Sequence, residues 1–490
     1  MKGRAVSIDA LRGLAIIGMV LSGTISRNPD LPGWLFHAQV GPPEFSFNPQ
    51  QPGITWVDLV FPFFLFAMGL AFPFSLNRMM EKGHARSAIA RKIILRTLKL
   101  FMFAVLLGHL SPYHYPTNLG IWRWVMGLLA FAGFFLSFCV FPQWPGRRKL
   151  LNTSGYLLLA VLVVIRVSVL NQPFSLYKHD IIILVLANMA LFGALIWWLT
   201  RSNWYLRLGI LGLYLGLRLS HGQEGTWQHA FWEFNFMEGL VALVPPMKEG
   251  LQALGAETVQ SVFYHANYLK YLFIVLPASI LGDALYQRIQ QKETEDTNAS
   301  DRRLHYLLMA IALLAVVINL VGLYHRWTQG NFFLNILLGG VMIYIAIRPR
   351  LRIDPLLKPI ILWSVFWVIL GLAFEAYEGG IRKDHATMSY FFVTAGISGY
   401  VLMAFRILFN NINRSYLFYF IQSIGKNPMV GYVAVAYAVA PVLALLQVLP
   451  FINEWHQQWS WLGVARGLLL TTLMILMTHW TVKRKLFWKT

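Results

Sequence analysis

Fourteen apolar segments recur along this chain, and they restrict the fold it can adopt. They are centred near residues 18, 65, 101, 131, 160, 190, 212, 277, 314, 339, 367, 398, 438 and 472. Hydrophobic residues make up 57% of the chain and charged residues only 13%, with a mean hydropathy of +0.55. A chain this apolar is typical of a protein that crosses a bilayer repeatedly as helices. The sequence therefore predicts an all-α polytopic membrane protein with about 12–14 transmembrane helices.

Basic residues lie in short clusters between these segments, and they predict an orientation. If all fourteen segments cross, the short seventh (about 204–219) included, the clusters share the side of the N-terminus. If the seventh segment does not cross, the predicted orientation of all later segments is reversed, and their basic clusters fall on the opposite side. We therefore expect both termini in the cytoplasm and loops 27–53 and 220–267 outside the inner (plasma) membrane. Topology accounts for the net charge of +20, so nucleic acid is not expected as a partner, and the single cysteine, Cys139, excludes an internal disulfide.

Three regions follow along the chain. Residues 1–289 are predicted to form an N-terminal transmembrane core, residues 290–303 (QQKETEDTNASDRR in one-letter code) a hydrophilic cytoplasmic linker, and residues 304–490 the C-terminal helices of the same bundle.

The stretch from Trp34 to Gly69 carries the first candidate site. A polar loop with His37 runs into an apolar segment that contains Asp58. An ionisable group in such a segment usually faces a cavity or a polar partner, and a histidine is the natural proton acceptor near neutral pH. Two interpretations stay open: Asp58 orients the imidazole of a base, or Asp58 starts a helix and His37 is an ordinary loop histidine.

Six blocks of sequence, in order, resemble one family. They are SIDALRGL at 7–14, FHA at 36–38, DLVFPFFLFAMG at 58–69, NYLKYLFIVLPASILGD at 267–283, IRKDHATMSYFF at 381–392 and IGKNPMVGY at 424–432. Together they resemble the membrane acetyltransferases typified by heparan-alpha-glucosaminide N-acetyltransferase, in their bacterial form. The resemblance implies an acyltransferase-type bundle that takes acetyl-coenzyme A from the cytoplasm as co-substrate. It also implies that His37, at the FHA position, is catalytic, whether as a base or through an acetyl-histidine.

One position departs from this family. Where the resembled enzymes have an asparagine, and a wider acyltransferase superfamily a histidine, this chain has Gly23. Acyl transfer needs donors for the oxyanion of the tetrahedral intermediate. The candidates nearby are Ser22, Thr24 and backbone N–H groups around Gly23.

Further candidate residues bind either the acceptor or the donor. On the outer side, the expected acceptor-binding residues are Lys383, Asp384, Ser389 and Tyr390, with Thr387 and with Glu375 or Glu378 beside them. Glu233 in the 220–267 loop is a further candidate for binding the acceptor. This loop forms either a substrate lid or a plain surface helix. On the inner side, Arg12, Arg96 and Asn427 are candidates for binding coenzyme A. Each has a plainer alternative: an ion pair with Asp9 for Arg12, topology for Arg96, and a helix cap for Asn427.

The sequence thus predicts an acetyltransferase that modifies an amino sugar or glycan at the outer face, with membrane lipid and this acceptor as partners and no metal. Whether it forms a homodimer is left open. Two alternatives are a transporter or flippase of a sugar or lipid-linked glycan, and a non-catalytic relative that binds glycans.

Overall fold

The computed structural model describes residues 2–233, 266–291, 301–411 and 416–489. Most of the 220–267 loop and of the 290–303 linker lies outside these ranges. Among the described residues, eleven helical segments are long and apolar enough to cross a membrane, and α4 (Trp122–Phe138) and α16 (Leu357–Ala373) are shorter apolar helices. The predicted seventh segment is α8 (Trp204–Ser220). All fourteen predicted segments are therefore helical, which confirms an all-α polytopic membrane protein.

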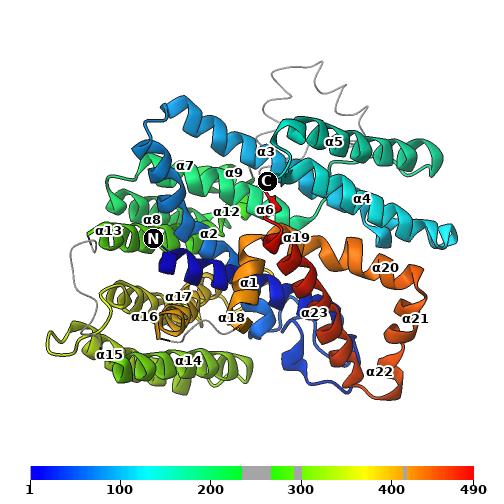
Figure 1. The fold of residues 1–490 in the computed structure, drawn as a ribbon. Helices are drawn as coiled ribbons and strands as arrows, with labels where there is room; N and C mark the ends of the chain where they lie inside the picture. Colours follow the sequence, from blue (N-terminus) through cyan, green and yellow to red (C-terminus); the bar gives the residue numbers. More distant parts are fainter. Residues whose placement is uncertain (1, 234–265, 292–300, 412–415, 490) are drawn as a thin grey trace. The chain divides into compact units, whose positions relative to one another are not determined.

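Two compact units, labelled by their helices in Figure 1, make up the chain. Unit 1 comprises residues 1–75, 273–432 and 450–482, so it joins the first and last parts of the sequence. Besides α16 it contains α1 (Lys2–Thr24), most of α2 (Trp56–Glu81), α13 (Leu272–Gln291), α14 (Arg302–Tyr324), α15 (Thr328–Ile347), α17 (Met388–Asn411), α18 (Tyr416–Lys426), most of α19 (Pro428–Ala434), α21 (Val448–Asn453), α22 (Trp455–Gln458) and α23 (Leu462–Lys483).

Unit 2 comprises residues 76–272, 433–449 and 483–490. Besides α4 and α8 it contains α3 (Arg86–Leu110), α5 (Arg148–Val164), α6 (Ile181–Asn188), α7 (Ala194–Leu199), α9 (Trp227–Glu233), α12 (Ala266–Leu269) and α20 (Ala440–Leu445). Short π-helical turns, Ile165–Val169, Met189–Gly193 and Val435–Val439, interrupt or extend these helices. Two-residue strands β1 (Cys139–Val140) and β2 (Phe487–Trp488) pair antiparallel and tie the C-terminal end of the chain to the end of α4.

Close helix packing organises unit 1. Helix α1 packs along α18, where Gly13 and Gly425 each face the backbone of the other helix so closely that a Cβ atom would collide. Small residues permit such approach in membrane helices. The two most buried candidate spans among the described residues are α2 and α17, with 83% and 89% of their most apolar windows inside the protein. Both helices are apolar all round, which suits a position surrounded by protein rather than lipid.

A ring of three asparagines joins α14 to α15. Asn319 Nδ2 donates to Asn335 Oδ1 at 2.7 Å, Asn335 Nδ2 to Asn331 Oδ1 at 2.9 Å, and Asn331 Nδ2 to Asn319 Oδ1 at 3.4 Å. The three side chains are at most 1% exposed. Each side-chain amide donates a hydrogen bond to the next one. The ring therefore fixes the register of the two helices and leaves none of the three side chains without a hydrogen-bond partner.

Helices α2 and α17 begin at the same end of unit 1, since Tyr390 Oη donates to the carbonyl oxygen of Asp58 at 2.8 Å. The chain passes through ten apolar helical segments from α2 to α16 when α8 is counted among the described elements. An even number of crossings returns the chain to the side on which it started. Ten crossings by these described segments, with the 17 residues or about 25 Å of α8 among them, agree with that shared end.

Candidate functional site

The start of α2 forms the base of the site. Thr55 precedes the helix, and its backbone N–H donates to Asp58 Oδ2 at 2.8 Å, while the N–H of Val57 donates to Thr55 Oγ1 at 3.3 Å. This reciprocal arrangement resembles a capping box, with aspartate at the third helical position. Asp58 is fully buried, and its other oxygen, Oδ1, accepts no hydrogen bond within the described structure. One carboxylate oxygen therefore caps the helix while the other is turned to the site.

Packing beneath the 27–53 loop holds His37 in place. Leu31, Leu35 and Phe36 form a buried cluster with Ile25 at the end of α1, and Phe45 meets Phe36 edge to face at 4.9 Å between ring centres. The backbone on both sides of the histidine is also bonded to the start of α2. Thr55 Oγ1 donates to the carbonyl oxygen of Phe36 at 2.7 Å, and the N–H of Ala38 donates to Asp58 Oδ2 at 3.4 Å.

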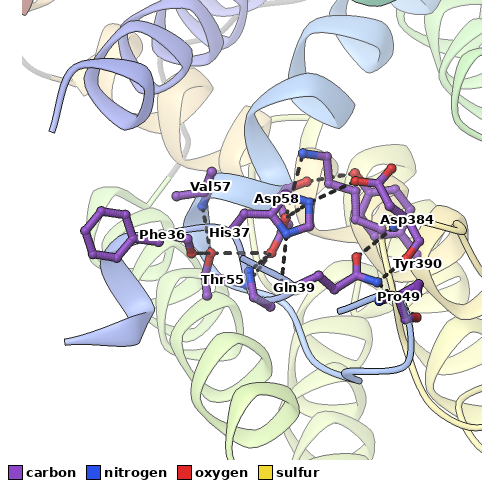
Figure 2. A network of polar contacts seen from close by, with 11 residues as sticks. Phe36, His37, Gln39, Pro49, Thr55, Val57, Asp58, Asp384 and Tyr390 are labelled. Carbon is purple, nitrogen blue, oxygen red and sulfur yellow. Dashed lines mark hydrogen bonds and ion pairs between the residues drawn. The ribbon is translucent and has the colours of Figure 1, made fainter. Parts of the chain in front are cut away.

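The His37 imidazole lies between two carboxylates and a backbone amide (Figure 2). Its Nε2 is 3.1 Å from Asp384 Oδ2 and 3.4 Å from Asp58 Oδ1, whereas Nδ1 accepts the N–H of Gln39 at 3.0 Å. An amide N–H can donate only to an unprotonated nitrogen, so this geometry assigns the neutral tautomer with its proton on Nε2. Nδ1 is then the basic nitrogen. The ring is 15% exposed, against 0% for the Asp58 side chain and 48% for that of Asp384.

Gln39 joins the loop of His37 to the loop before α17. Its amide nitrogen donates to the carbonyl oxygens of Asp384 and Pro49, and its amide oxygen accepts the backbone N–H of Asp384 at 2.8 Å. Two bonds to one peptide backbone fix the position of Asp384 relative to His37 (Figure 2). Gln39 is 1% exposed, so water does not compete for these bonds.

The loop before α17 is also held from its other side. Glu375 pairs with Arg326 and accepts the N–H of Ile381 at 3.2 Å, while Glu378 accepts the N–H of Met388. Arg382 donates to the carbonyl oxygen of Glu378. In the structure the two glutamates expected beside the acceptor thus support the loop backbone.

Three further candidates belong to the same place. Lys383 Nζ lies 3.9 Å from Asp58 Oδ1, and its side chain is 22% exposed. Tyr390 is buried and bonds the Asp58 backbone, so it fixes α17 against α2. Ser389 is 1% exposed, and its Oγ has no hydrogen-bond partner in the described part of the chain.

A polar cavity of about 430 Å³ opens beside this cluster. It is formed by the 27–53 loop with Tyr324 at the end of α14, and Ala38 and Gln39, which follow His37, are part of its wall. Its polar lining consists of Gln39, Glu44, Ser46, Asn48, Gln51 and Tyr324. The cavity offers amide, hydroxyl and carboxylate groups and no cationic side chain.

The remaining candidates lie elsewhere. Arg12 pairs with Asp9 at 3.6 Å, as the plainer alternative predicts, and donates to the carbonyl oxygen of Gly425 at 3.2 Å. Asn427, two residues on, is fully buried and donates to Thr481 of α23 at 2.8 Å. Both candidates for donor binding in unit 1 therefore have protein partners. Arg96 on α3 and Glu233 at the end of α9 are exposed residues of unit 2.

Sequence reasoning missed Gln39 and Thr55. The pattern of threonine three residues before aspartate at a helix start marks a capping box and could have identified Thr55. Nothing in the sequence around Gln39 marks a residue that bonds a loop 345 positions away.

The fold and this site define a polytopic membrane protein in which a cluster of ionisable residues, built around the buried Asp58, lies at the start of two protein-enclosed helices. Residues 4–242 match the domain of unknown function DUF5009, so the N-terminal part of the chain is similar to that family. The match includes His37 and Asp58 but not Lys383, Asp384 or Tyr390. No curated protein matches the chain.

Proposed function

We propose that the protein transfers an acetyl group from acetyl-coenzyme A to an amino sugar or glycan, with His37 as the general base. The observation that supports this most is the His37 imidazole, held by two carboxylates at Nε2 beside a polar cavity. Carboxylates that hold one nitrogen of a histidine orient the ring and stabilise the cation that forms when the other nitrogen takes a proton.

In the proposed reaction, an amine or hydroxyl of the acceptor attacks the carbonyl carbon of the thioester. His37 Nδ1 takes the acceptor's proton, and Asp58 and Asp384 stabilise the imidazolium through Nε2–H. When the tetrahedral intermediate collapses, the C–S bond breaks, and the departing coenzyme A thiolate receives the proton from His37. Because the N–H of Gln39 occupies Nδ1 at rest, the turn at residues 37–39 has to release that nitrogen first.

The cavity suits a polyhydroxylated acceptor. Its amide and hydroxyl groups can pair with sugar hydroxyls, and the Glu44 carboxylate favours an acceptor that carries an ammonium group over an anionic one. Its volume is within the range of sites for small molecules. We place this site at the extracytoplasmic face of the inner membrane, with the donor arriving from the cytoplasm, on the basis of the charge distribution between the segments.

The test is transfer of radiolabelled acetyl from acetyl-coenzyme A to glucosamine by the purified, detergent-solubilised protein. Wild type should label the sugar and His37→Ala should not, while His84→Ala, which removes an exposed histidine after α2, should match wild type. Uptake of intact sugar into proteoliposomes without coenzyme A would instead support a transporter. Sugar binding without turnover would support the non-catalytic relative.

A further inference from the structure

The oxyanion of the proposed reaction needs a donor, and the residues near Gly23 do not supply one. Ser22 Oγ donates to the carbonyl oxygen of Met19 at 3.0 Å, and Thr24 Oγ1 donates to that of Val20 at 2.7 Å. The backbone N–H groups of residues 22–24 lie inside α1, where they donate along the helix. Each expected donor therefore already has a partner.

Lys383 is a cation at the site with unused donors. Its ammonium group carries three N–H donors, and none of them donates a hydrogen bond within the described part of the chain. The nearest anionic atom recorded for it is Asp58 Oδ1, at 3.9 Å, which is longer than a hydrogen bond. The same Oδ1 lies 3.4 Å from His37 Nε2, so the lysine and the base share one carboxylate oxygen.

The surroundings hold the backbone that carries Lys383 and leave its side chain partly exposed. The neighbouring Asp384 backbone is fixed by Gln39, and Arg382 is bonded through Thr387 and Glu378, so the backbone on both sides of Lys383 is held. The side chain itself is 22% exposed, which leaves it accessible to a substrate. A cation beside a base is a candidate donor for the oxyanion of acyl transfer.

We propose that Lys383 is a catalytic residue that stabilises the oxyanion of the tetrahedral intermediate, a proposal that rests on the acetyltransferase function above. As the acceptor adds to the thioester carbon, the carbonyl π electrons move onto oxygen, and the Lys383 ammonium donates a hydrogen bond to that oxygen. When the electrons return to re-form the C=O bond, the C–S bond breaks. Lys383 keeps all its protons throughout, since His37 alone carries the transferred proton.

Two other roles for Lys383 predict different kinetics. A lysine that only binds the acceptor would change KM and leave kcat unaltered, because it would interact equally with substrate and transition state. A lysine that only balances the Asp58 charge would act through His37, and its loss would move the pH dependence of kcat/KM. An oxyanion donor acts in the transition state alone, so its loss lowers kcat.

The experiment compares wild type, Lys383→Met, Lys383→Arg and the control Lys358→Met in the acetyl-transfer assay over a range of pH. We expect Lys383→Met to lower kcat by about 10²–10³-fold at the pH optimum of each variant, as for the loss of one oxyanion donor, with KM for glucosamine unchanged. Lys383→Arg should restore part of kcat, since it retains a cationic donor, and Lys358→Met should match wild type. Thermal unfolding of each variant shows whether it is folded.

Four outcomes overturn the proposal. If a folded Lys383→Met variant keeps kcat within threefold of wild type, Lys383 does not stabilise the oxyanion. A change in KM alone leads to the same conclusion. If the pH profile of Lys383→Met is displaced and full activity returns at another pH, Lys383 only balances the charge of Asp58 and acts through His37. Inactive wild type overturns the proposed function and this role together, whereas an active wild type with an unaffected Lys383→Met overturns only this role.

Discussion

Replacing Asp58 by asparagine separates the two functions of its carboxylate. The asparagine oxygen can still accept the N–H of Thr55, so the cap of α2 is kept. The amide nitrogen then faces His37 Nε2, which carries a proton, so two donors oppose each other where an anion had been. The ring loses its orientation and the imidazolium loses a buried counter-ion.

The size of the effect follows from burial. The Asp58 carboxylate is the buried anion 3.4 Å from the imidazolium that forms in the reaction. Leaving a buried charged group without its partner costs about 1.5–3 kcal/mol, which is roughly a 10- to 150-fold change at 1.36 kcal/mol per factor of ten. We expect Asp58→Asn to lower kcat/KM by that factor. Asp384→Asn should lower it by only about fivefold or less, because an ion pair with a half-exposed carboxylate contributes about 0–1 kcal/mol. The smaller effect should shrink further in high salt.

The assay is acetyl transfer to glucosamine at low and high salt, with the exposed Asp30→Asn variant of the same loop as control. The melting temperature of Asp58→Asn should stay within about 3 °C of wild type, since a lost helix-end charge contributes about 0.3–1 kcal/mol. If Asp384→Asn is the more damaging substitution, or if Asp58→Asn retains more than a third of wild-type kcat/KM, the assignment of Asp58 as the main partner of His37 is wrong.

Three further predictions concern other parts of the structure. Gln39→Glu places an anionic oxygen against the carbonyl oxygen of Asp384. One buried group is then left without a hydrogen-bond partner, so kcat/KM should fall about tenfold. An unchanged rate of acetyl transfer would show that the Gln39 contact does not position Asp384. Asn335→Ala opens the asparagine ring between α14 and α15 and should destabilise the protein by about 1–2 kcal/mol, measured as a lower melting temperature. Phe333→Ala, at an exposed residue of α15, is the control, and equal melting temperatures would contradict the role of the ring. Burial raises the pKa of the Cys139 thiol to about 12, so maleimide at pH 8 should label the folded protein slowly and the protein in SDS completely; rapid labelling of the folded form would refute that environment.

The helices could be predicted from the sequence because the bilayer imposes their length and their apolar character. Every predicted segment is helical, even α8, which contains two arginines and is not among the helices long and apolar enough to cross a membrane. At this level the physics is local, since each segment satisfies its own backbone hydrogen bonds.

The site could be predicted only in part. The sequence nominated His37, Asp58, Lys383, Asp384 and Tyr390, and the structure brings all five together. The sequence predicted Asp384 beside the acceptor and did not predict its contact with the His37 imidazole. Which nitrogen of the histidine is basic depends on a backbone amide and on a residue 347 positions away, and neither leaves a local pattern in the sequence.

The distance along the chain between His37 and Asp384 has a consequence for biosynthesis. The ribosome inserts the histidine loop early, but its second carboxylate partner follows 347 residues later. At about 5–20 residues per second, that interval lasts roughly 20–70 s. During this time the first helices are in the membrane without the loop that completes the site, so a nascent chain that stops before residue 383 carries His37 and Asp58 but neither Lys383 nor Asp384.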